Sequence, residues 1–404
     1  MNTITKQHTM TQCISNWQLF WTFLKIGSTA FGGFMALISV VQNYLVDRKK
    51  LLSDSDVLDG ISLATILPGP VAFNVVAYSG YKINGIFGAI VCTTAVTIPS
   101  FLLILLLSHF YFTWGEIPAV SNVFMGFIPA VAAIIVAATV NMGSKTLKGV
   151  PEYAIAITAF LILLFAGGFY STIAIIAASA LVGLLLFQDR EKTETATINK
   201  PEPDKKSSVP VPIIAFLVLP LSAMILPYLN TGSIMAIKLL ITFAGMSVLL
   251  FGGGFVFIPM IQEIVVDSYG WVTNKEFIDG IALGQITPGP ILISATFIGY
   301  KIAGVAGAIA ATIGIFVPPA MLMLICTHFL EKIKKSIKIN LALKGIRCAV
   351  IGMIAAASIV VWQSAQQDWK SAIIFLVALL SLMKYRIEVA WIIPVSGAVG
   401  YLLY

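Results

Sequence analysis

The chain has 404 residues, of which 58% are hydrophobic and only 11% are charged, less than half the charged share of an ordinary soluble domain. This composition excludes a soluble globular fold, and the absence of strand-like alternation argues against an outer-membrane barrel. The net charge of +7 is expected to face anionic lipid from cytoplasmic loops rather than nucleic acid. Four scattered cysteines lack metal-ligand spacing, so they predict small buried side chains and no metal site.

Six apolar elements are expected in the first half, at residues 17–46, 57–81, 83–112, 117–140, 152–165 and 170–187. The first contains Phe31-Gly32-Gly33, and Pro68-Gly69-Pro70 interrupts the second near its middle. Several of these runs exceed the ~20 apolar residues that cross a bilayer. The sequence therefore predicts an all-α polytopic membrane protein, which we expect to be a multi-pass protein of the inner or plasma membrane.

The composition changes at residues 188–210, which are charged, rich in threonine and poor in apolar residues. This stretch predicts a hydrophilic cytoplasmic linker, because it has too few apolar side chains to form a core. An extra helix is expected over 211–226. Six further elements follow, at 234–266, 277–300, 302–330, 341–361, 369–383 and 389–403. The expected domains are a first repeat at 1–187, the linker, and the extra helix plus a second repeat at 211–404.

The two halves are copies of one unit. Phe251-Gly252-Gly253 and Pro288-Gly289-Pro290 repeat both motifs of the first half at one offset, since 251 − 31 and 288 − 68 are both 220. Beyond the triplets the offset becomes 219, so that Lys82 matches Lys301. Such a duplication predicts two homologous repeats with broken helices, and about thirteen membrane segments if both broken elements span.

Equivalent loops of the two repeats carry different charge. Residues 109–126 contain no lysine or arginine, whereas the counterpart at 328–345 contains five lysines. Because lysine and arginine favour the cytoplasmic side, this contrast predicts that the halves are inverted. The basic stretch 48–50 disagrees with that topology if the first broken element spans. The stretch 48–50 lies on the cytoplasmic side if the first broken element is re-entrant, that is, if it enters and leaves the membrane on the same side. The number of crossings must then be counted again.

A Pro-Gly-Pro triplet inside a membrane helix frees backbone groups that lipid cannot satisfy. Paired interruptions at matching positions are typical of a transporter's substrate site near the bilayer midplane. The half-helices that begin at Pro70 and Pro290 would present positive dipole ends and free amides, which suit an anion. Asn74 and Ser294 would add donors. The structural alternative is a pair of packing kinks.

Lys82 and Lys301 could add positive charge near the triplets, or instead extend to the membrane interface. The Phe-Gly-Gly motifs allow two interpretations, which are close helix packing and a second discontinuity that exposes amides. Asp59 and Asp279 begin the broken elements, where helix capping explains them and proton coupling is the alternative. No nucleotide-binding or catalytic motif is present, so we expect no enzyme and no cofactor.

The duplicated series of Phe-Gly-Gly, Asp-Gly and Pro-Gly-Pro motifs resembles the chromate ion transporter family in its long two-domain form. This resemblance covers nearly the whole chain. It implies a transporter that expels chromate and confers chromate resistance, with sulfate as the related oxyanion and with oppositely oriented halves. Carried over motif by motif, it places both Phe-Gly-Gly and both Pro-Gly-Pro triplets on the translocation path.

The residues expected to bind or guide the anion are therefore Phe31, Gly32, Gly33, Pro68, Gly69, Pro70, Asn74, Lys82, Phe251, Gly252, Gly253, Pro288, Gly289, Pro290, Ser294 and Lys301. The expected mechanism is gradient-driven alternating access around a site near the midplane. Two alternatives remain open, which are a transporter of sulfate or a related oxyanion and a passive anion channel. The sequence also leaves open whether the chain forms a homo-oligomer.

Overall fold

The computed structural model describes residues 14–30, 34–114, 117–167, 169–187, 235–250, 257–327 and 336–404. Within these ranges every regular element is a helix, as the composition predicted. Of the helices that the structure describes, four are long and apolar enough to cross a membrane: Val71–Trp114, Val120–Thr146, Ile291–Thr327 and Lys338–Gln363. The expected linker at 188–210, the extra helix at 211–226 and both Phe-Gly-Gly triplets lie outside the described residues.

The first repeat contains α1 (Asn16–Thr29), α2 (Phe34–Gln42), a π-helical turn η1 (Asn43–Arg48), α3 (Asp54–Ile66), α4 (Val71–Trp114), α5 (Pro118–Thr146), α6 (Val150–Ala166) and α7 (Phe169–Leu186). The element expected over 17–46 is thus two helices. α1 ends at Thr29, and its C-cap residue Ala30 leaves the helical conformation with φ −84° and ψ 64°. The helix thus ends directly before the first Phe-Gly-Gly triplet.

The second repeat contains α10 (Met235–Ser247), α11 (Phe257–Gln262), a π-helical turn η3 (Glu263–Ser268), α12 (Asn274–Ile286), a short 3₁₀ turn η4 (Ile291–Ile293), α13 (Ser294–Thr327), α15 (Ile337–Gln363), α16 (Trp369–Met383) and α17 (Val389–Leu403). The two π-helical turns occupy equivalent positions, 220 residues apart. Each is tied to the next helix by the preceding glutamine, because Gln42 donates to Asp54 over 3.0 Å and Gln262 donates to Asn274 over 2.8 Å.

A sharp turn divides α4 into two limbs. Asn84 and Gly85 leave the helical conformation, and Gly85 has φ +64°. The chain reverses there, because Gly80 and Gly88 face each other across the turn and a Cβ on Gly80 would lie 2.5 Å from the Gly88 carbonyl oxygen. We call residues 71–83 the short limb of α4 and residues 86–114 its long limb. The same turn at Gly304 (φ +57°) divides α13 into limbs at 294–302 and 305–327.

Each Pro-Gly-Pro triplet is the tip of a helical hairpin. Gly60 of α3 lies against Tyr78 of the short limb, and these two residues are nine positions before and after Gly69. In the second repeat Gly280 of α12 lies against Phe297 in the same way. The two helices of each pair therefore run antiparallel, and we call residues 54–83 the first hairpin and residues 274–302 the second hairpin.

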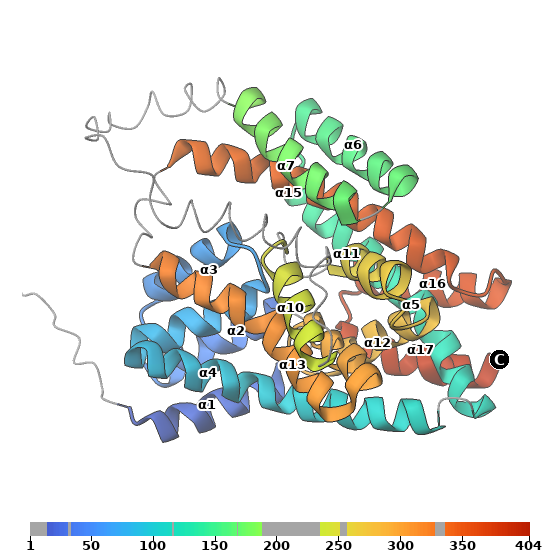
Figure 1. Ribbon diagram of the computed structural model, residues 1–404, viewed down its shortest axis with the longest axis horizontal. Helices are drawn as coiled ribbons and strands as arrows, with labels where there is room; N and C mark the ends of the chain where they lie inside the picture. The colour runs from blue at the N-terminus through green and yellow to red at the C-terminus, as the bar shows by residue number, and fades with distance from the viewer. Residues whose placement is uncertain are drawn as a thin grey trace, which may run out of the picture.

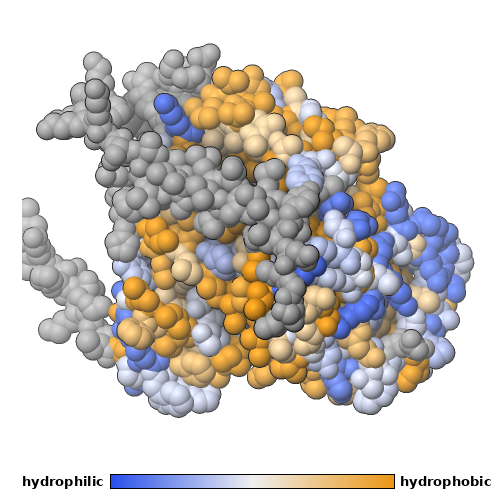
Figure 2. Space-filling view, viewed as in Figure 1, coloured by the Kyte–Doolittle hydropathy of each residue, from blue (hydrophilic) through white to orange (hydrophobic). Residues whose placement is uncertain are grey.

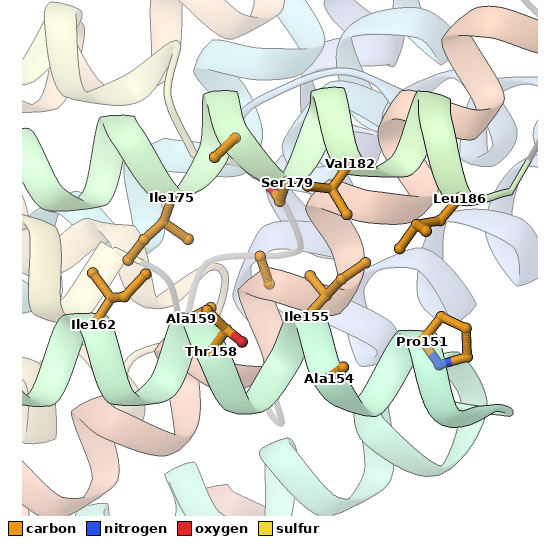
Figure 3. Close-up of a pocket in the computed structure, with 12 residues that line it drawn as sticks. Pro151, Ala154, Ile155, Thr158, Ala159, Ile162, Ile175, Ser179, Val182 and Leu186 are labelled. Atoms are coloured by element: carbon orange, nitrogen blue, oxygen red, sulfur yellow. The ribbon is translucent and has the colours of Figure 1, made fainter.

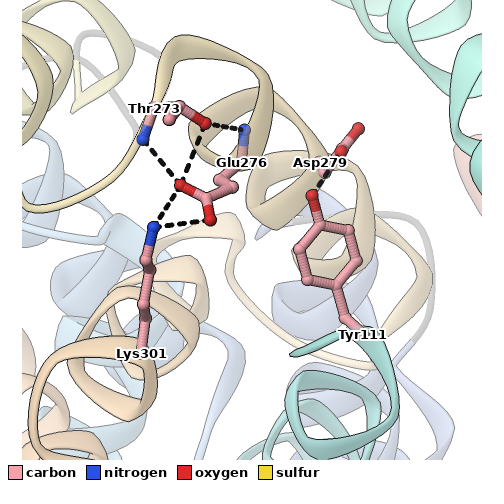
Figure 4. Close-up of polar contacts among 5 residues, drawn as sticks. All are labelled: Tyr111, Thr273, Glu276, Asp279 and Lys301. Atoms are coloured by element: carbon pink, nitrogen blue, oxygen red, sulfur yellow. Dashed lines mark hydrogen bonds and ion pairs between the residues drawn. The ribbon is translucent and has the colours of Figure 1, made fainter. Parts of the chain in front are cut away.

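The two hairpins meet the long limb of α4 from its opposite ends. This limb starts at the base of the first hairpin, directly after the turn at Gly85. Near its other end, the Tyr111 hydroxyl donates to Oδ2 of Asp279 in the second hairpin over 2.7 Å (Figure 4). His109 Nδ1 lies 3.0 Å from the Tyr300 hydroxyl at the base of that hairpin. The tips consequently point toward each other near the middle of the limb.

The last helices of each repeat pack on the other repeat. α6 and α7 lie beside α15 along the top of the molecule in Figure 1, whereas α16 and α17 pack against α5. Glycines allow the close crossings, since Gly126 of α5 touches Gly400 of α17, and Gly183 of α7 touches Gly345 of α15. Figure 2 shows apolar side chains over the middle and top of this face and hydrophilic ones gathered at its right-hand end.

Candidate functional site

The tip of the first hairpin is buried and held by the second repeat. Gly69 has φ +105°, a conformation that L side chains rarely adopt, and its amide donates to the Leu250 carbonyl over 2.6 Å. A Cβ on Gly69 would lie 2.3 Å from Cβ of Pro319. Within the tip, the Asn74 side chain donates to the Pro68 carbonyl over 3.1 Å. The tip therefore has a fixed position against the other repeat.

The tip of the second hairpin repeats this arrangement against the first repeat. Gly289 has φ +114°, and its amide donates to the Ala30 carbonyl over 3.0 Å. The Ser100 hydroxyl, from the middle of the long limb of α4, donates to the Pro288 carbonyl. Ala30 and Leu250 are equivalent positions of the two repeats, 220 residues apart, and each directly precedes a Phe-Gly-Gly triplet.

The two tips make equivalent contacts with opposite repeats. Each Pro-Gly-Pro tip contacts the residue that precedes the Phe-Gly-Gly triplet of the opposite repeat. We call these two contacts together the tip junction and define it by Ala30, residues 67–70, Leu250 and residues 287–290. Of the sixteen residues expected at the site, the structure places the two Pro-Gly-Pro triplets and Asn74 at these contacts. The Phe-Gly-Gly residues lie outside the described residues, and their described neighbours reach the junction.

The backbone chemistry of the junction favours an anion. The carbonyls of Pro68, Pro288, Ala30 and Leu250 each accept a hydrogen bond from the protein, so they are already occupied. In contrast, the amides of the first turn after Pro70 have no acceptor within their own helix, because they precede the first helical hydrogen bond, which Asn74 donates to Pro70. Donors and the positive end of the helix dipole therefore remain available.

Two further polar side chains lie beside the tips. Arg347 comes from the middle of the apolar helix α15, and its Nη2 donates to the Thr65 carbonyl in the last turn of α3 over 3.2 Å. Its side chain remains exposed. Gln285 occupies the position equivalent to Thr65 in the second hairpin, and its Nε2 is buried without a partner among the described residues. Both groups are donors that an anion can use.

Neither Arg347 nor Gln285 was expected at the site from the sequence. The signal for Arg347 was present, because an ionisable residue inside the apolar run 341–361 is a functional candidate. No comparable signal marked Gln285, since its place beside the tip follows only from the hairpin.

Lys82 and Lys301 do not reach the tips. Lys82 lies twelve residues after Pro70, about 18 Å along the helix axis. It pairs with Asp56 at the base of the first hairpin over 3.6 Å. Lys301 pairs with Glu276 at the base of the second hairpin, and Thr273 completes this group (Figure 4). Each lysine therefore joins the two helices of its hairpin at the base.

Ser294 and Asp279 each have a hydrogen-bond partner within the protein. The Ser294 hydroxyl donates to the Ile291 carbonyl over 2.8 Å, within the first turn after the second tip. Helix capping, which was expected of Asp59 and Asp279, is performed by Ser53 and Thr273 instead. Asp279 is buried and accepts from Tyr111, as described above. Asp59 is half-buried.

Other features of the described residues do not suit an anion. A cleft of about 240 Å³ between α6 and α7 is lined by Ile175, Val182, Ile155 and similar side chains (Figure 3). No charged residue lines it, so it is suited to lipid tails rather than to ions. The described residues contain no cluster of ligands for a metal ion. Cys92, Cys326 and Cys348 are buried free thiols, and Cys13 lies outside the described residues.

Comparison with known proteins gives a consistent result. The family model described as "Chromate transporter" matches residues 17–184 and 237–401. A probable chromate transport protein of Synechococcus elongatus is 31% identical, over 91% of this chain and 90% of its own. A chromate transport protein of Cupriavidus metallidurans is 28% identical over 96% and 93%. An uncharacterized transporter of Methanocaldococcus jannaschii is 30% identical over 95% and 94%. No solved structure matches the chain.

Proposed function

The chain belongs to the chromate transporter family, and on that premise we propose that it carries chromate across a membrane by binding the ion at the tip junction. The observation that carries this proposal is the reciprocal contact of Gly69 with Leu250 and of Gly289 with Ala30. In each contact a broken helix of one repeat meets a helix end of the other repeat, and broken helices at a repeat interface are where secondary transporters bind substrate.

A tetrahedral dianion matches the groups at this junction. The free first-turn amides supply directed donors, and the Arg347 guanidinium supplies a positive charge whose planar fork suits an oxyanion. Asn74 and Ser100 hold the tip carbonyls away from the anion by donating to them. Selectivity for chromate over sulfate then depends on the fit of the ion, because both are divalent tetrahedral oxyanions.

We propose that the hairpins re-enter the membrane rather than cross it. The pair of α1 and α2 also enters and leaves the membrane on one side. Ile14 precedes α1 and Lys49 follows η1, and the two residues border the same cleft. Four helices of the first repeat then cross, namely the long limb of α4 together with α5, α6 and α7. The segment at 211–226 would carry the chain to the other side, so the second repeat begins inverted. The total is about nine crossings instead of thirteen.

The distribution of basic residues supports this topology. The base of the first hairpin is then cytoplasmic, and one side of the membrane receives all the basic stretches: 48–50, 145–148, 188–210, 332–338 and 384–386. The stretch 48–50 no longer disagrees with the others. The attachment of the two hairpins at opposite ends of the long limb of α4 supports the same inversion.

Alternating access follows from the two equivalent contacts. Rotation of one repeat against the other can break the contact of Gly69 with Leu250 while it keeps that of Gly289 with Ala30, and the reverse rotation exchanges them. Each state opens the junction to one side. We propose that an ion gradient or anion exchange drives this cycle and that the net direction is efflux from the cytoplasm through the plasma membrane.

The test is uptake of labelled chromate into everted membrane vesicles, with and without an uncoupler. We expect accumulation that the uncoupler abolishes, as well as competition by excess sulfate that is weaker than competition by unlabelled chromate. Flux that continues unchanged with the uncoupler indicates a passive channel. Stronger competition by sulfate indicates that sulfate is the substrate. Vesicles without the protein are the control.

A further inference from the structure

A polar cleft opens between α1 and the segment from η1 to Leu51. It encloses about 540 Å³ and is lined by Ile14, Trp17, Gln18, Trp21, Thr22, Lys25, Tyr44, Lys49 and Leu51. The residues from α1 recur every three or four positions, so they form one face of that helix. Tyr44 of η1, together with Lys49 and Leu51 in the loop that follows, forms the opposite wall.

The walls of this cleft carry positive charge without a compensating acid. Lys25 and Lys49 come from opposite walls, and no carboxylate is among the residues that line the cleft. Neither lysine forms an ion pair with another residue of the described chain. Gln18 and the Tyr44 hydroxyl add hydrogen-bond donors. A site with two unpaired cations and neutral donors attracts an anion.

The cleft leads toward the tip junction. Ile14 and Lys49 lie at its outer end, close to the base of the first hairpin, where Asn84 donates to the Ile14 carbonyl over 2.9 Å. Lys25 lies eleven residues further along α1 and five residues before Ala30, the residue that accepts from Gly289. At about 1.5 Å per residue, Lys25 is about 8 Å along the axis from that contact.

The equivalent positions of the second repeat are filled. Lys238, Tyr269 and Trp271 correspond to Gln18, Lys49 and Leu51 at the offset of 220. There the Lys238 ammonium lies 4.4 Å from the centroid of the Tyr269 ring and 5.8 Å from that of Trp271, and the two rings stack on each other. The second repeat thus places a cation–aromatic stack where the first repeat has an open cleft.

We propose that the cleft between α1 and the segment from η1 to Leu51 is a loading vestibule that takes a dissolved divalent tetrahedral oxyanion before it reaches the tip junction, and that the stack of Lys238 on Tyr269 and Trp271 closes the opposite entrance. This inference rests on the proposed function, and it adds a second anion site on one face of the protein. Lys25 and Lys49 are its binding residues. The structure corresponds to the state that is open toward the base of the first hairpin.

An anionic lipid headgroup is the other source of such an anion. Trp17 and Trp21 are 66% and 45% exposed, which suits the headgroup level of a bilayer. We favour the dissolved ion, because the cleft continues past these tryptophans to Lys25, toward the junction. The experiment below separates the two sources.

The test measures the electrostatic potential in the cleft with a cysteine in place of Gln18. The native cysteines are replaced, the Q18C protein is reconstituted in uncharged lipid, and the labelling rates of an anionic and a cationic methanethiosulfonate reagent are compared. We expect the ratio of anionic to cationic rates to fall about fivefold with either Lys25→Gln or Lys49→Gln. Lys25→Arg should keep the ratio, and Lys145→Gln, an exposed site at the end of α5, should leave it unchanged. Sulfate and chromate should slow labelling.

The vestibule is wrong if neither lysine substitution changes the ratio of anionic to cationic labelling rates. It is also wrong if sulfate and chromate slow the labelling of Q18C only when anionic lipid is present. Because this measurement does not depend on transport, it can fail while labelled chromate still accumulates in vesicles, and then only the vestibule is wrong. Conversely, if the labelling ratios are as expected but the protein transports no chromate, the cleft is an anion site and the proposed function is wrong.

Discussion

The amide of Gly289 donates to the carbonyl of Ala30 over 3.0 Å, and this bond joins the tip of the second hairpin to the end of the first helix. Its counterpart joins Gly69 to Leu250 over 2.6 Å. Because each bond crosses between the repeats, the two hairpin tips set the relative position of the halves.

Alanine at Gly69 is expected to be more damaging than alanine at Gly289. Both residues have φ above +100°, but the new Cβ at Gly69 meets a proline ring at 2.3 Å, whereas that at Gly289 meets the Ser100 hydroxyl at 2.9 Å. Gly167→Ala is the matched control, since Gly167 has φ +55° and open space around it. That control should cost only about 1–2 kcal/mol. Thermal unfolding in detergent checks the order, and equal stability of all three variants would contradict it.

Ser100→Ala should weaken the junction, whereas Ser108→Ala should not. Both serines are buried in the long limb of α4, but Ser100 donates to Pro288 of the other repeat and Ser108 donates to Ile104 of its own helix. Loss of the Ser100 hydroxyl leaves a buried carbonyl unpaired, which costs about 1–3 kcal/mol. Denaturation midpoints and chromate uptake are the measurements. A Ser108 variant that is as impaired as the Ser100 variant would show that the contact with Pro288 is unimportant.

Replacing Lys301 should affect the second hairpin rather than chromate affinity. Lys301 pairs with Glu276 at the hairpin base, far from the tip. Lys301→Gln should therefore lower stability modestly, by about 1 kcal/mol or less, and leave the KM for chromate near its original value. Lys301→Arg, which can keep the pair with Glu276, should keep the stability. A large rise in the KM for chromate in the Lys301→Gln protein would place Lys301 at the substrate site after all.

The proposed inversion has a direct topological consequence. Lys49 precedes the first hairpin and Lys275 lies in the first turn of the second hairpin, so the two should face opposite sides of the membrane. Single cysteines at these positions, K49C and K275C, are labelled with an impermeant thiol reagent in intact cells and in everted vesicles. We expect K275C to react in cells and K49C to react in everted vesicles. Labelling of both from one side would rule out the inversion.

The sequence predicted the duplication, the helical class and the helix breaks at the Pro-Gly-Pro triplets, because proline and glycine act through local backbone geometry. It also divided the chain between 57–81 and 83–112 and between 277–300 and 302–330, a few residues before the turns at Gly85 and Gly304. It did not predict that these turns are the bases of the two hairpins. Lys82 was therefore expected near the tip, although it pairs with Asp56 at the base.

The exchange of helices between repeats was also beyond prediction. α6 follows α5 in the chain but packs on α15, nearly two hundred residues away. Sequence patterns report which face of a helix is apolar, not which helix covers that face. The same limit applies to Arg347, which stands in the second repeat but donates to Thr65 of the first hairpin. A tertiary contact of this kind requires the fold.

The most direct test of the account is equilibrium binding of labelled chromate to the purified protein with Arg347→Gln. Lys338→Gln, an exposed charge in the first turn of the same helix, is the matched control. Because a charged hydrogen bond to an oxyanion contributes about 1.5–3 kcal/mol, the account predicts at least tenfold weaker binding for Arg347→Gln and unchanged binding for Lys338→Gln, with both variants folded. Chromate binding by folded Arg347→Gln protein as tight as that of the original would contradict the anion site at the tip junction.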